Sequence, residues 1–386
     1  MVDWYVPHAS YLYQREQSMD NGHSRTTLFV AAGGGGDALA SLLLSRQLGT
    51  SGQAPIVASY SWDRRILDPL PGPRSVPDFE GVRQLTPHNV EVTARSRLRS
   101  GGQSTLCLLA ETTASARFVL LDPHHGAVGM RRQIEELVQH FSFESVVLVD
   151  VGGDLVATGS EDELRSPLAD ALALASLADL PVPVVVAVAG AGLDGELPAS
   201  YVRSRCIDLG GNLLTRLHDS DIEPYFSSLA EHPSEATTLL AAAALGITGR
   251  AEIRDNADIV SVTEAGAQVY VLRGSGALAG NKLAQELTAT RSMAEAEAIT
   301  LAVCGRCELD YERQKATTLP LRKPSAAEMQ RRLQDYWLST AARGITLATF
   351  RRLSEVMRLP RYDPDLVRSV AGLHANKHLA LCRTER

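Results

Sequence analysis

The chain has 386 residues, of which 45% are hydrophobic and 22% charged, and its formal net charge is −7. This length and composition allow one large α/β domain, or a domain with an appendage, around an aliphatic core. No run of about 18 apolar residues is free of charge and proline, so we expect no membrane association. The first residues lack the pattern of a secretory signal and the five cysteines are scattered, which indicates a cytoplasmic protein with reduced thiols.

Short aliphatic runs alternate with helical patterns along much of the chain. Continuous apolar strands separated by helices are typical of a parallel sheet that is covered on both faces. The predicted strands cover residues 26–32, 55–60, 105–110, 117–122, 145–151, 181–190 and 268–274. Helices are predicted over residues 37–48, 128–141, 167–178 and 281–290, and from near Ser325, Thr346 and Asp363. We therefore predict a doubly wound, mostly parallel, Rossmann-like α/β fold.

A change of composition near Arg313 predicts a second part of the chain. The stretch "TTLPLRKPS" (317–325) contains two prolines that interrupt any helix, so it is the best candidate for a linker. Residues 313–386 contain 15 Lys and Arg against 6 Asp and Glu, whereas the rest of the chain carries a net charge of −16. We predict an α/β domain over residues 1–312 and a basic helical extension over residues 313–386. The extension either docks on the acidic body or binds nucleic acid.

Four consecutive glycines stand between the first predicted strand and the first predicted helix. They are Gly33, Gly34, Gly35 and Gly36 in the stretch "AAGGGGDALAS", which has the outline of a dinucleotide-binding loop. Asp37, however, occupies the helix N-terminus, where backbone N–H groups would otherwise attract a phosphate. Its carboxylate either caps the helix or forms part of a binding site that repels a bare phosphate.

The same pattern returns after a second strand. "GGDALAS" recurs as "GGDLVAT", which contains Gly152, Gly153 and Asp154, and a third loop, "AGAGLDGEL", offers Asp194 and Glu196. All of these loops follow predicted parallel strands, so we expect them at one edge of the sheet, where ligands usually bind. Such a rim suits a cation, an amino group, ribose hydroxyls or a phosphate bridged by Mg²⁺. The alternative is that the glycines permit tight turns and the aspartates cap helices.

Two adjacent histidines follow another predicted strand. His124 and His125 lie in "LLDPHHGAVG" beside a strand-end aspartate, and either one is a candidate general base. Asp154 in the second glycine loop is the third candidate catalytic residue. The alternative for the histidine pair is a solvated loop.

Basic residues are candidates for binding the phosphate that the aspartates repel. Arg64 and Arg74 belong to the loop "SWDRRILDPLPGPR", which follows the strand at residues 55–60. A further glycine loop, "LRGSGALAGNK", has no carboxylate at its turn and offers Ser275 and Lys282 to an oxyanion. For each arginine the alternative is ordinary surface charge.

The combination of these motifs resembles a known protein family. "AAGGGGDALAS", "SWDRRILDPLPGPR", "DVGGDLVATGSEDELRSPLADALAL" and "GAGLDGEL" together are similar to an archaeal and bacterial family catalogued as a domain of unknown function, number 1152. The resemblance covers residues 26–298. It implies an α/β fold and no particular activity.

The candidate residues together predict a group-transfer enzyme of small-molecule metabolism, including specialised metabolism. Its donor would contain phosphate and would be a nucleotide or an aminoacyl-tRNA, the tRNA being bound by the basic extension. The alternatives are a Mg²⁺-dependent nucleotide hydrolase or lyase, and a nucleotide-binding sensor without catalysis. The cofactor stays open, with Mg²⁺ as a candidate, and no residue is singled out as a metal ligand. We also expect a small-molecule substrate and a homo-oligomer as partners.

Overall fold

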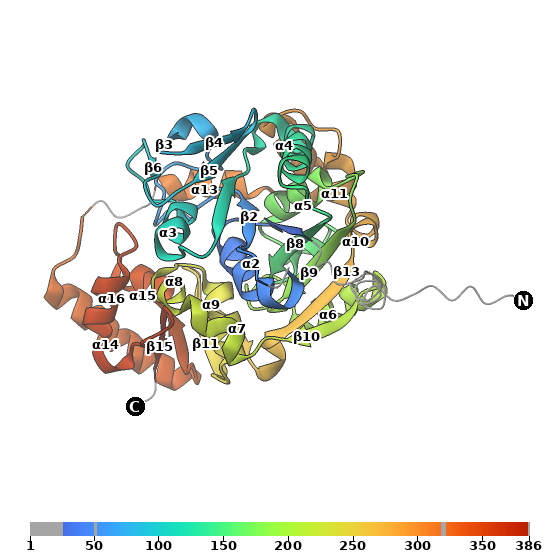
Figure 1. Ribbon diagram of the computed structural model, residues 1–386. Coiled ribbons are helices and arrows are strands. Elements are labelled where there is room, and N and C mark those ends of the chain that lie inside the picture. Colours follow the sequence, from blue (N-terminus) through green and yellow to red (C-terminus); the bar gives the residue numbers. More distant parts are fainter. Residues whose placement is uncertain (1–25, 50–51, 318–321, 385–386) are drawn as a thin grey trace, which may run out of the picture.

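A large mixed sheet of nine strands forms the centre of the molecule (Figure 1). The computed structural model describes residues 26–49, 52–317 and 322–384. The strand order is β10-β13-β9-β8-β1-β2-β7-β5-β4, and the five strands from β9 to β7 run parallel. An antiparallel pair extends each edge. The strands are β1 (Thr27–Ala31), β2 (Ile56–Ser59), β4 (Arg83–Thr86), β5 (Asn89–Val92), β7 (Arg117–Leu120), β8 (Ser145–Val151), β9 (Val184–Ala189), β10 (Asn212–Arg216) and β13 (Gln268–Arg273).

Helices cover both faces of this sheet and enclose two hydrophobic cores (Figure 1). Successive side chains of a strand point to opposite faces, so Leu28 of β1 joins one core and Phe29 joins the other. The first core is closed by α4 (Gly126–Phe141), α5 (Pro167–Ser176), α6 (Ala199–Asp208), α10 (Gly274–Gly280), α11 (Lys282–Leu287) and α12 (Met293–Cys304). The second is closed by α2 (Gly35–Leu48), α3 (Thr105–Thr112), α7 (Asp219–Ile222), α8 (Phe226–Glu231) and α9 (Glu235–Ala244).

Several further elements are short. The strands β3 (Phe79–Glu80) and β6 (Arg97–Leu98) pair with each other, and α13 (Glu308–Ala316) follows α12. Short 3-10 helices connect larger elements at η1 (Val76–Asp78), η2 (Pro123–His125), η3 (Asp154–Val156), η4 (Glu223–Tyr225), η5 (Glu264–Ala267) and η6 (Gly372–His374). Among the described residues, none of the helices has both the length and the apolar composition needed to cross a membrane.

The strand predicted over residues 105–110 is wrong, because these residues begin the helix α3. The hydroxyl of Ser104 accepts a hydrogen bond from the backbone N–H of Leu106 at 3.2 Å, which is the geometry of a helix N-cap. Leu106 and Leu109 then face the sheet at helical spacing. Because a six-residue apolar run fits a buried strand and one helix face equally well, only the capping serine distinguished the two structures.

The last part of the chain shares a second sheet with residues that precede it. This sheet has the order β12-β11-β14-β15, and β14 (Leu347–Thr349) pairs in parallel with β11 (Gly249–Ile253). The other two strands are β12 (Asp258–Val262) and β15 (Leu381–Arg383). The three helices predicted at the end of the chain are confirmed as α14 (Ala326–Arg343), α15 (Phe350–Met357) and α16 (Pro364–Ala371), which form a third hydrophobic core.

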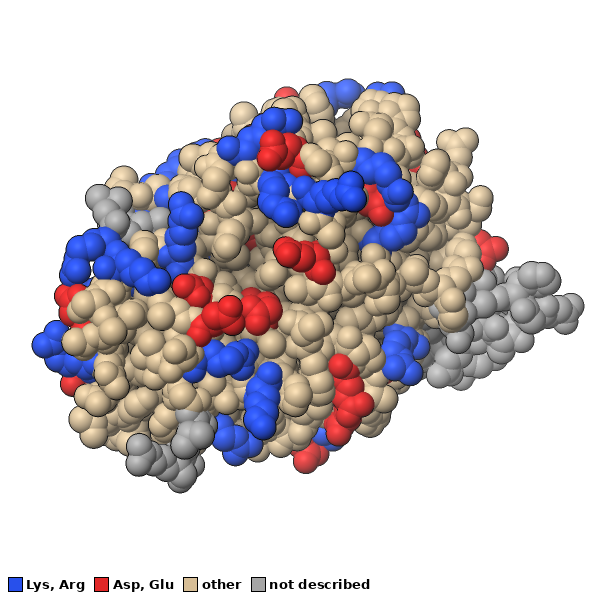
Figure 2. Space-filling model, turned by 60° about the vertical axis from the view of Figure 1, so that its left-hand side comes forward, with Lys and Arg blue, Asp and Glu red and all other residues tan. Residues whose placement is uncertain are grey.

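Several arginines of residues 322–384 pair with acidic residues of the α/β body. Arg343 and Arg352 form ion pairs with Glu252, whose side chain is fully buried. On the face that carries these helices, Lys and Arg side chains form several separate groups with Asp and Glu between them (Figure 2). These ion pairs fit the docking interpretation of the basic segment. The division at residues 312/313 stays a prediction; part of the predicted linker and the N-terminal residues considered for a secretory signal lie outside the described residues.

Candidate functional site

A cavity of about 170 Å³ lies beyond the carboxyl ends of the central parallel strands. Its wall contains the glycine loop after β1, the loops after β2, β8 and β9, and the first turns of α2, α5 and α9. Carboxylates dominate this wall, since it includes Asp37, Asp63, Asp150, Asp154, Asp170, Asp194, Glu196, Glu235, Glu308 and Glu312. The structure therefore brings the predicted aspartate loops together at one edge of the sheet.

The glycine loop holds the carboxylate of Asp37 inside the cavity. Its Oδ2 accepts a hydrogen bond from the backbone N–H of Gly33 at 2.6 Å, and its Oδ1 accepts one from Val151 at 3.2 Å. A Cβ atom at Gly35 would lie 1.7 Å from Oγ1 of Thr105, so a larger residue does not fit there. Burial raises the pKa of Asp37 to about 7, against the two backbone hydrogen bonds that lower it.

Two further aspartates face Asp37 from neighbouring elements. Asp150 lies near the carboxyl end of β8, and its two oxygens accept backbone hydrogen bonds from Gly153 at 3.4 Å and Leu155 at 3.1 Å. Asp170 lies in the first turn of α5 with only 8% of its surface exposed, and its Oδ1 is buried without a hydrogen-bond partner among the described residues. Asp170 is therefore free to bind a ligand.

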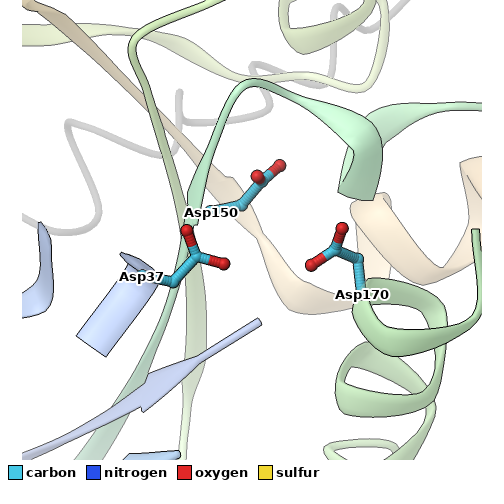
Figure 3. A group of neighbouring side chains, drawn as sticks. All are labelled: Asp37, Asp150 and Asp170. Atoms are coloured by element: carbon cyan, nitrogen blue, oxygen red, sulfur yellow. The ribbon is translucent and has the colours of Figure 1, made fainter. Parts of the chain in front are cut away.

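Asp37, Asp150 and Asp170 form a triad of converging carboxylates (Figure 3). One oxygen from each lies within 4.8 Å of the others, and within the described residues none of the three forms an ion pair with Lys or Arg. Burial and then the charges of the neighbouring aspartates raise the pKa of Asp150 and of Asp170 well above the usual range. The triad thus holds negative charge that calls for protons or a bound cation.

Asp154, Asp194 and Glu196 form a second group within 4.8 Å, but its members differ in their bonding. Glu196 accepts hydrogen bonds from Ser166 Oγ at 2.6 Å and from Arg254 at 2.7 Å. Burial raises the pKa of Glu196, but the charge of Arg254 outweighs this effect and lowers the pKa to about 2. Glu196 is therefore neutralised within the protein, whereas Oδ1 of Asp154 is buried without a partner among the described residues.

Other residues predicted for the site lie elsewhere. Arg64 lies on the cavity wall, but Arg74 does not, since it is 7% exposed and bound to Asp68 at 2.5 Å. His124 and His125 are exposed in η2 outside this cavity, and the hydrogen bond to Asp122 raises the pKa of His124.

The loop with Ser275 and Lys282 is also separate from the acidic cavity. Because β13 is antiparallel to β9, the residues after β13 lie at the opposite edge of the sheet. Ser275 borders a different cavity there, beside Val184 at the amino end of β9, and Lys282 is exposed at the start of α11. Ser275 and Lys282 therefore do not join the aspartate loops in one site, and the prediction that they bind the phosphate repelled by those aspartates is wrong for this cavity.

The comparison with known families covers most of the chain. The chain matches the model of a family described as a protein of unknown function (DUF1152) over residues 28–316, about three quarters of its length. The chain belongs to this family. The resemblance seen in the sequence is thus confirmed, and the DUF1152 region contains the whole triad. No curated protein and no solved structure matches the chain.

Several cavity residues of this DUF1152 protein were missed by sequence reasoning. Asp150 and Asp170 are the most important, and each is the single charge within an apolar segment, "SVVLVDV" and "PLADALALAS". A lone carboxylate in a strand or helix that is otherwise buried was a usable signal, because such a group is seldom buried without a partner. Arg351 was missed because it comes from α15, far from the glycine loops in sequence.

A buried histidine beside the cavity predicts how stability depends on pH. His232 is 1% exposed, its Nδ1 accepts a hydrogen bond from the backbone N–H of Ser234 at 3.1 Å, and burial lowers its pKa to about 3. The unfolded chain therefore takes up a proton below pH 6.5 that the folded protein excludes. We expect His232 to contribute a loss of about 1.4 kcal/mol in the free energy of unfolding per pH unit below 6.5.

Urea unfolding at pH 7, 5.5 and 4.5 tests this expectation. The variant His232→Asn keeps a hydrogen-bond acceptor near the position of Nδ1 but takes up no proton, so its stability should fall less steeply with decreasing pH. His140→Asn, which changes an exposed histidine of α4, is the matched control and should follow the unsubstituted protein. Equal pH dependence in all three proteins would contradict the assignment.

Proposed function

We propose that this DUF1152 protein is an enzyme that depends on a divalent cation held by Asp37, Asp150 and Asp170. The observation that carries the proposal is the triad itself, three buried carboxylates within 4.8 Å of one another. Oxygen ligands from carboxylates are those that Mg²⁺ and Mn²⁺ prefer. Oδ1 of Asp170, buried without a partner among the described residues, supplies the free ligand atom.

A phosphate-containing substrate agrees with the position of the triad. We infer that the sheet is Rossmann-like, because its parallel strands follow the order β7-β2-β1-β8-β9, in which the chain reverses direction across the sheet between β1 and β8. Ligands of such sheets bind outside the carboxyl ends of the strands at this switch point. Asp37 and Asp150 lie there, so a cation between them would allow a phosphate to approach loops that otherwise repel it.

The proposed chemistry is group transfer from, or hydrolysis of, a nucleotide. The cation would neutralise the phosphate and stabilise the charge on its leaving oxygen. Asp154, which lines the cavity and whose Oδ1 is buried without a partner among the described residues, would accept a proton from the attacking group. An aminoacyl-tRNA donor is less well supported, since two arginines of the basic segment, Arg343 and Arg352, are engaged with Glu252.

Removal of the cation tests this proposal. Titration with Mn²⁺, followed by electron paramagnetic resonance, should show a bound ion that Asp150→Asn abolishes and Asp162→Asn retains, since Asp162 is exposed. Nucleotide turnover should stop in EDTA and return with Mg²⁺ or Mn²⁺. The proposal would be wrong if the unsubstituted protein bound no Mn²⁺, or if Asp150→Asn bound it equally well.

A further inference from the structure

The cavity that holds the carboxylates is also lined by positive groups. Arg64 follows β2, Arg351 belongs to the first turn of α15, and both line the same cavity as the triad. The cavity therefore presents both carboxylates and guanidinium groups.

Arg64 is positioned to bind a ligand rather than a residue of the protein. Its side chain is exposed at the cavity wall and forms no hydrogen bond or ion pair with the residues that the structure describes. Its neighbours in sequence are different, because Asp63 is bound to Thr105 and Arg65 is buried. The guanidinium of Arg64 thus keeps its donors for a molecule in the cavity.

Arg351 is held in place but incompletely paired. Its side chain is 13% exposed and lies 3.4 Å from Oε2 of Glu235. Glu235 is already satisfied, since it accepts hydrogen bonds from Thr349 Oγ1 at 2.5 Å and from the backbone N–H of Arg254 at 3.0 Å. Nε of Arg351 is buried without a partner among the described residues, so the guanidinium retains unused donors beside the cavity.

Arg254 provides an instructive contrast in the same cavity. It donates to Oε1 of Glu196 at 2.7 Å, and the charges of Glu196, Asp194 and Asp154 raise its pKa against the effect of burial. The positive charge of Arg254 is therefore already balanced by carboxylates of the protein. Arg64 and Arg351, in contrast, also line the cavity and keep guanidinium N–H donors that no carboxylate of the described residues binds.

We propose that Arg64 and Arg351 form an anion subsite that binds the phosphate group of the substrate in the same cavity as the cation of the triad. This inference rests on the proposed function and names the part of the substrate that the two arginines bind. Two guanidinium groups and a divalent cation suit a terminal phosphate or a diphosphate, which carries two or more negative charges and several acceptor oxygens. The subsite also requires the segment beyond residue 316, because α15 supplies Arg351.

Calorimetric titration with inorganic pyrophosphate in the presence of Mn²⁺ tests the subsite. Arg64→Ala and Arg351→Lys should each weaken pyrophosphate binding about tenfold or more, whereas Mn²⁺ binding measured without pyrophosphate should persist. Arg331→Ala, which removes an exposed arginine of α14 outside the cavity, is the matched control. Thermal melts of each variant show whether it is folded, and Arg64→Ala changes an exposed side chain, so folding should not limit it.

The results separate this subsite from the cation proposal. Mn²⁺ binding with pyrophosphate affinity unchanged in Arg64→Ala and Arg351→Lys would overturn the subsite and leave the cation site in place. Absence of Mn²⁺ binding would instead overturn the proposed function. Parallel titrations with ADP and with ribose 5-phosphate distinguish a nucleotide substrate from a sugar phosphate. Both ligands should bind more weakly to the two variants. The ligand that resembles the substrate should bind the unsubstituted protein more tightly than the other.

Discussion

Replacing Asp170 by asparagine should abolish cation binding and, at the same time, make the cation-free protein more stable. The side chain is 8% exposed, lies within 4.8 Å of the oxygens of Asp37 and Asp150, and has a buried Oδ1 without a partner among the described residues. Asparagine keeps the shape but removes a carboxyl group whose ionisation burial and the two neighbouring aspartates disfavour in the folded protein. We expect a gain on the order of 1–2 kcal/mol in the free energy of unfolding, or a rise of a few degrees in Tm.

Thermal melts in EDTA and in excess Mn²⁺ would measure both effects. The unsubstituted protein should be less stable than Asp170→Asn in EDTA and should gain stability with Mn²⁺, because a ligand that binds only the folded state stabilises it. Asp170→Asn should not respond to Mn²⁺. A variant that is less stable in EDTA and still responds to Mn²⁺ would show that Asp170 has a structural role only.

Truncating the chain after Thr317 should unfold most of the protein. Glu235 would lose the hydroxyl of Thr349 and the charge of Arg351, and Glu252 would lose Arg343 and Arg352. A buried carboxylate left without its partner costs about 3–5 kcal/mol, and a typical protein is stable by only about 5–15 kcal/mol. Circular dichroism with urea should therefore show a loss of the cooperative transition.

A second truncated chain controls for the cause of this loss. Glu235→Gln with Glu252→Gln in the shortened chain removes both charges that would be left unpaired, so part of the stability should return. If instead the shortened chain unfolded at the same urea concentration as the complete one, residues 1–312 would form an independent domain, as the composition of the sequence predicts.

The sequence predicted the five parallel strands of the large sheet and seven of the helices, because apolar runs of distinct period mark them clearly. The runs at residues 145–151 and 181–190 became β8 and β9, and α14 and α16 begin where their patterns begin. The helix predicted from near Thr346 begins instead at Phe350, because residues 347–349 form the strand β14. The direction of a strand cannot be read from its apolar pattern. The antiparallel direction of β13, which places Ser275 at the opposite edge of the sheet, was therefore not predicted. The pairing of β14 with β11 could not be predicted either, because β14 has three residues, too few for a recognisable strand pattern.

The candidate site was predicted in outline but not in composition. The repeated glycine pattern located Asp37 and Asp154, because a glycine loop after a parallel strand must lie at one edge of the sheet. Asp150 and Asp170 lie within a strand and a helix, and the apolar pattern of such elements predicts how they pack but not which side chains meet. The carboxylates near each of them come from other elements of the fold. His124 and His125 follow β7 but lie outside the cavity, which shows that the shared edge alone does not bring residues into one site.

The hydrogen bonds around the cavity bear on the order in which the protein is made. Asp37 is fixed by Val151, 114 residues later in the chain, and the indole of Trp62 donates to Glu312, 250 residues later. Contacts between such distant residues form late in folding, since long loops must close first. A growing chain therefore leaves the ribosome before the proposed site is complete, because α15 adds Arg351 last, so a fragment that ends before α15 should bind the phosphate of the proposed substrate more weakly than the unshortened chain.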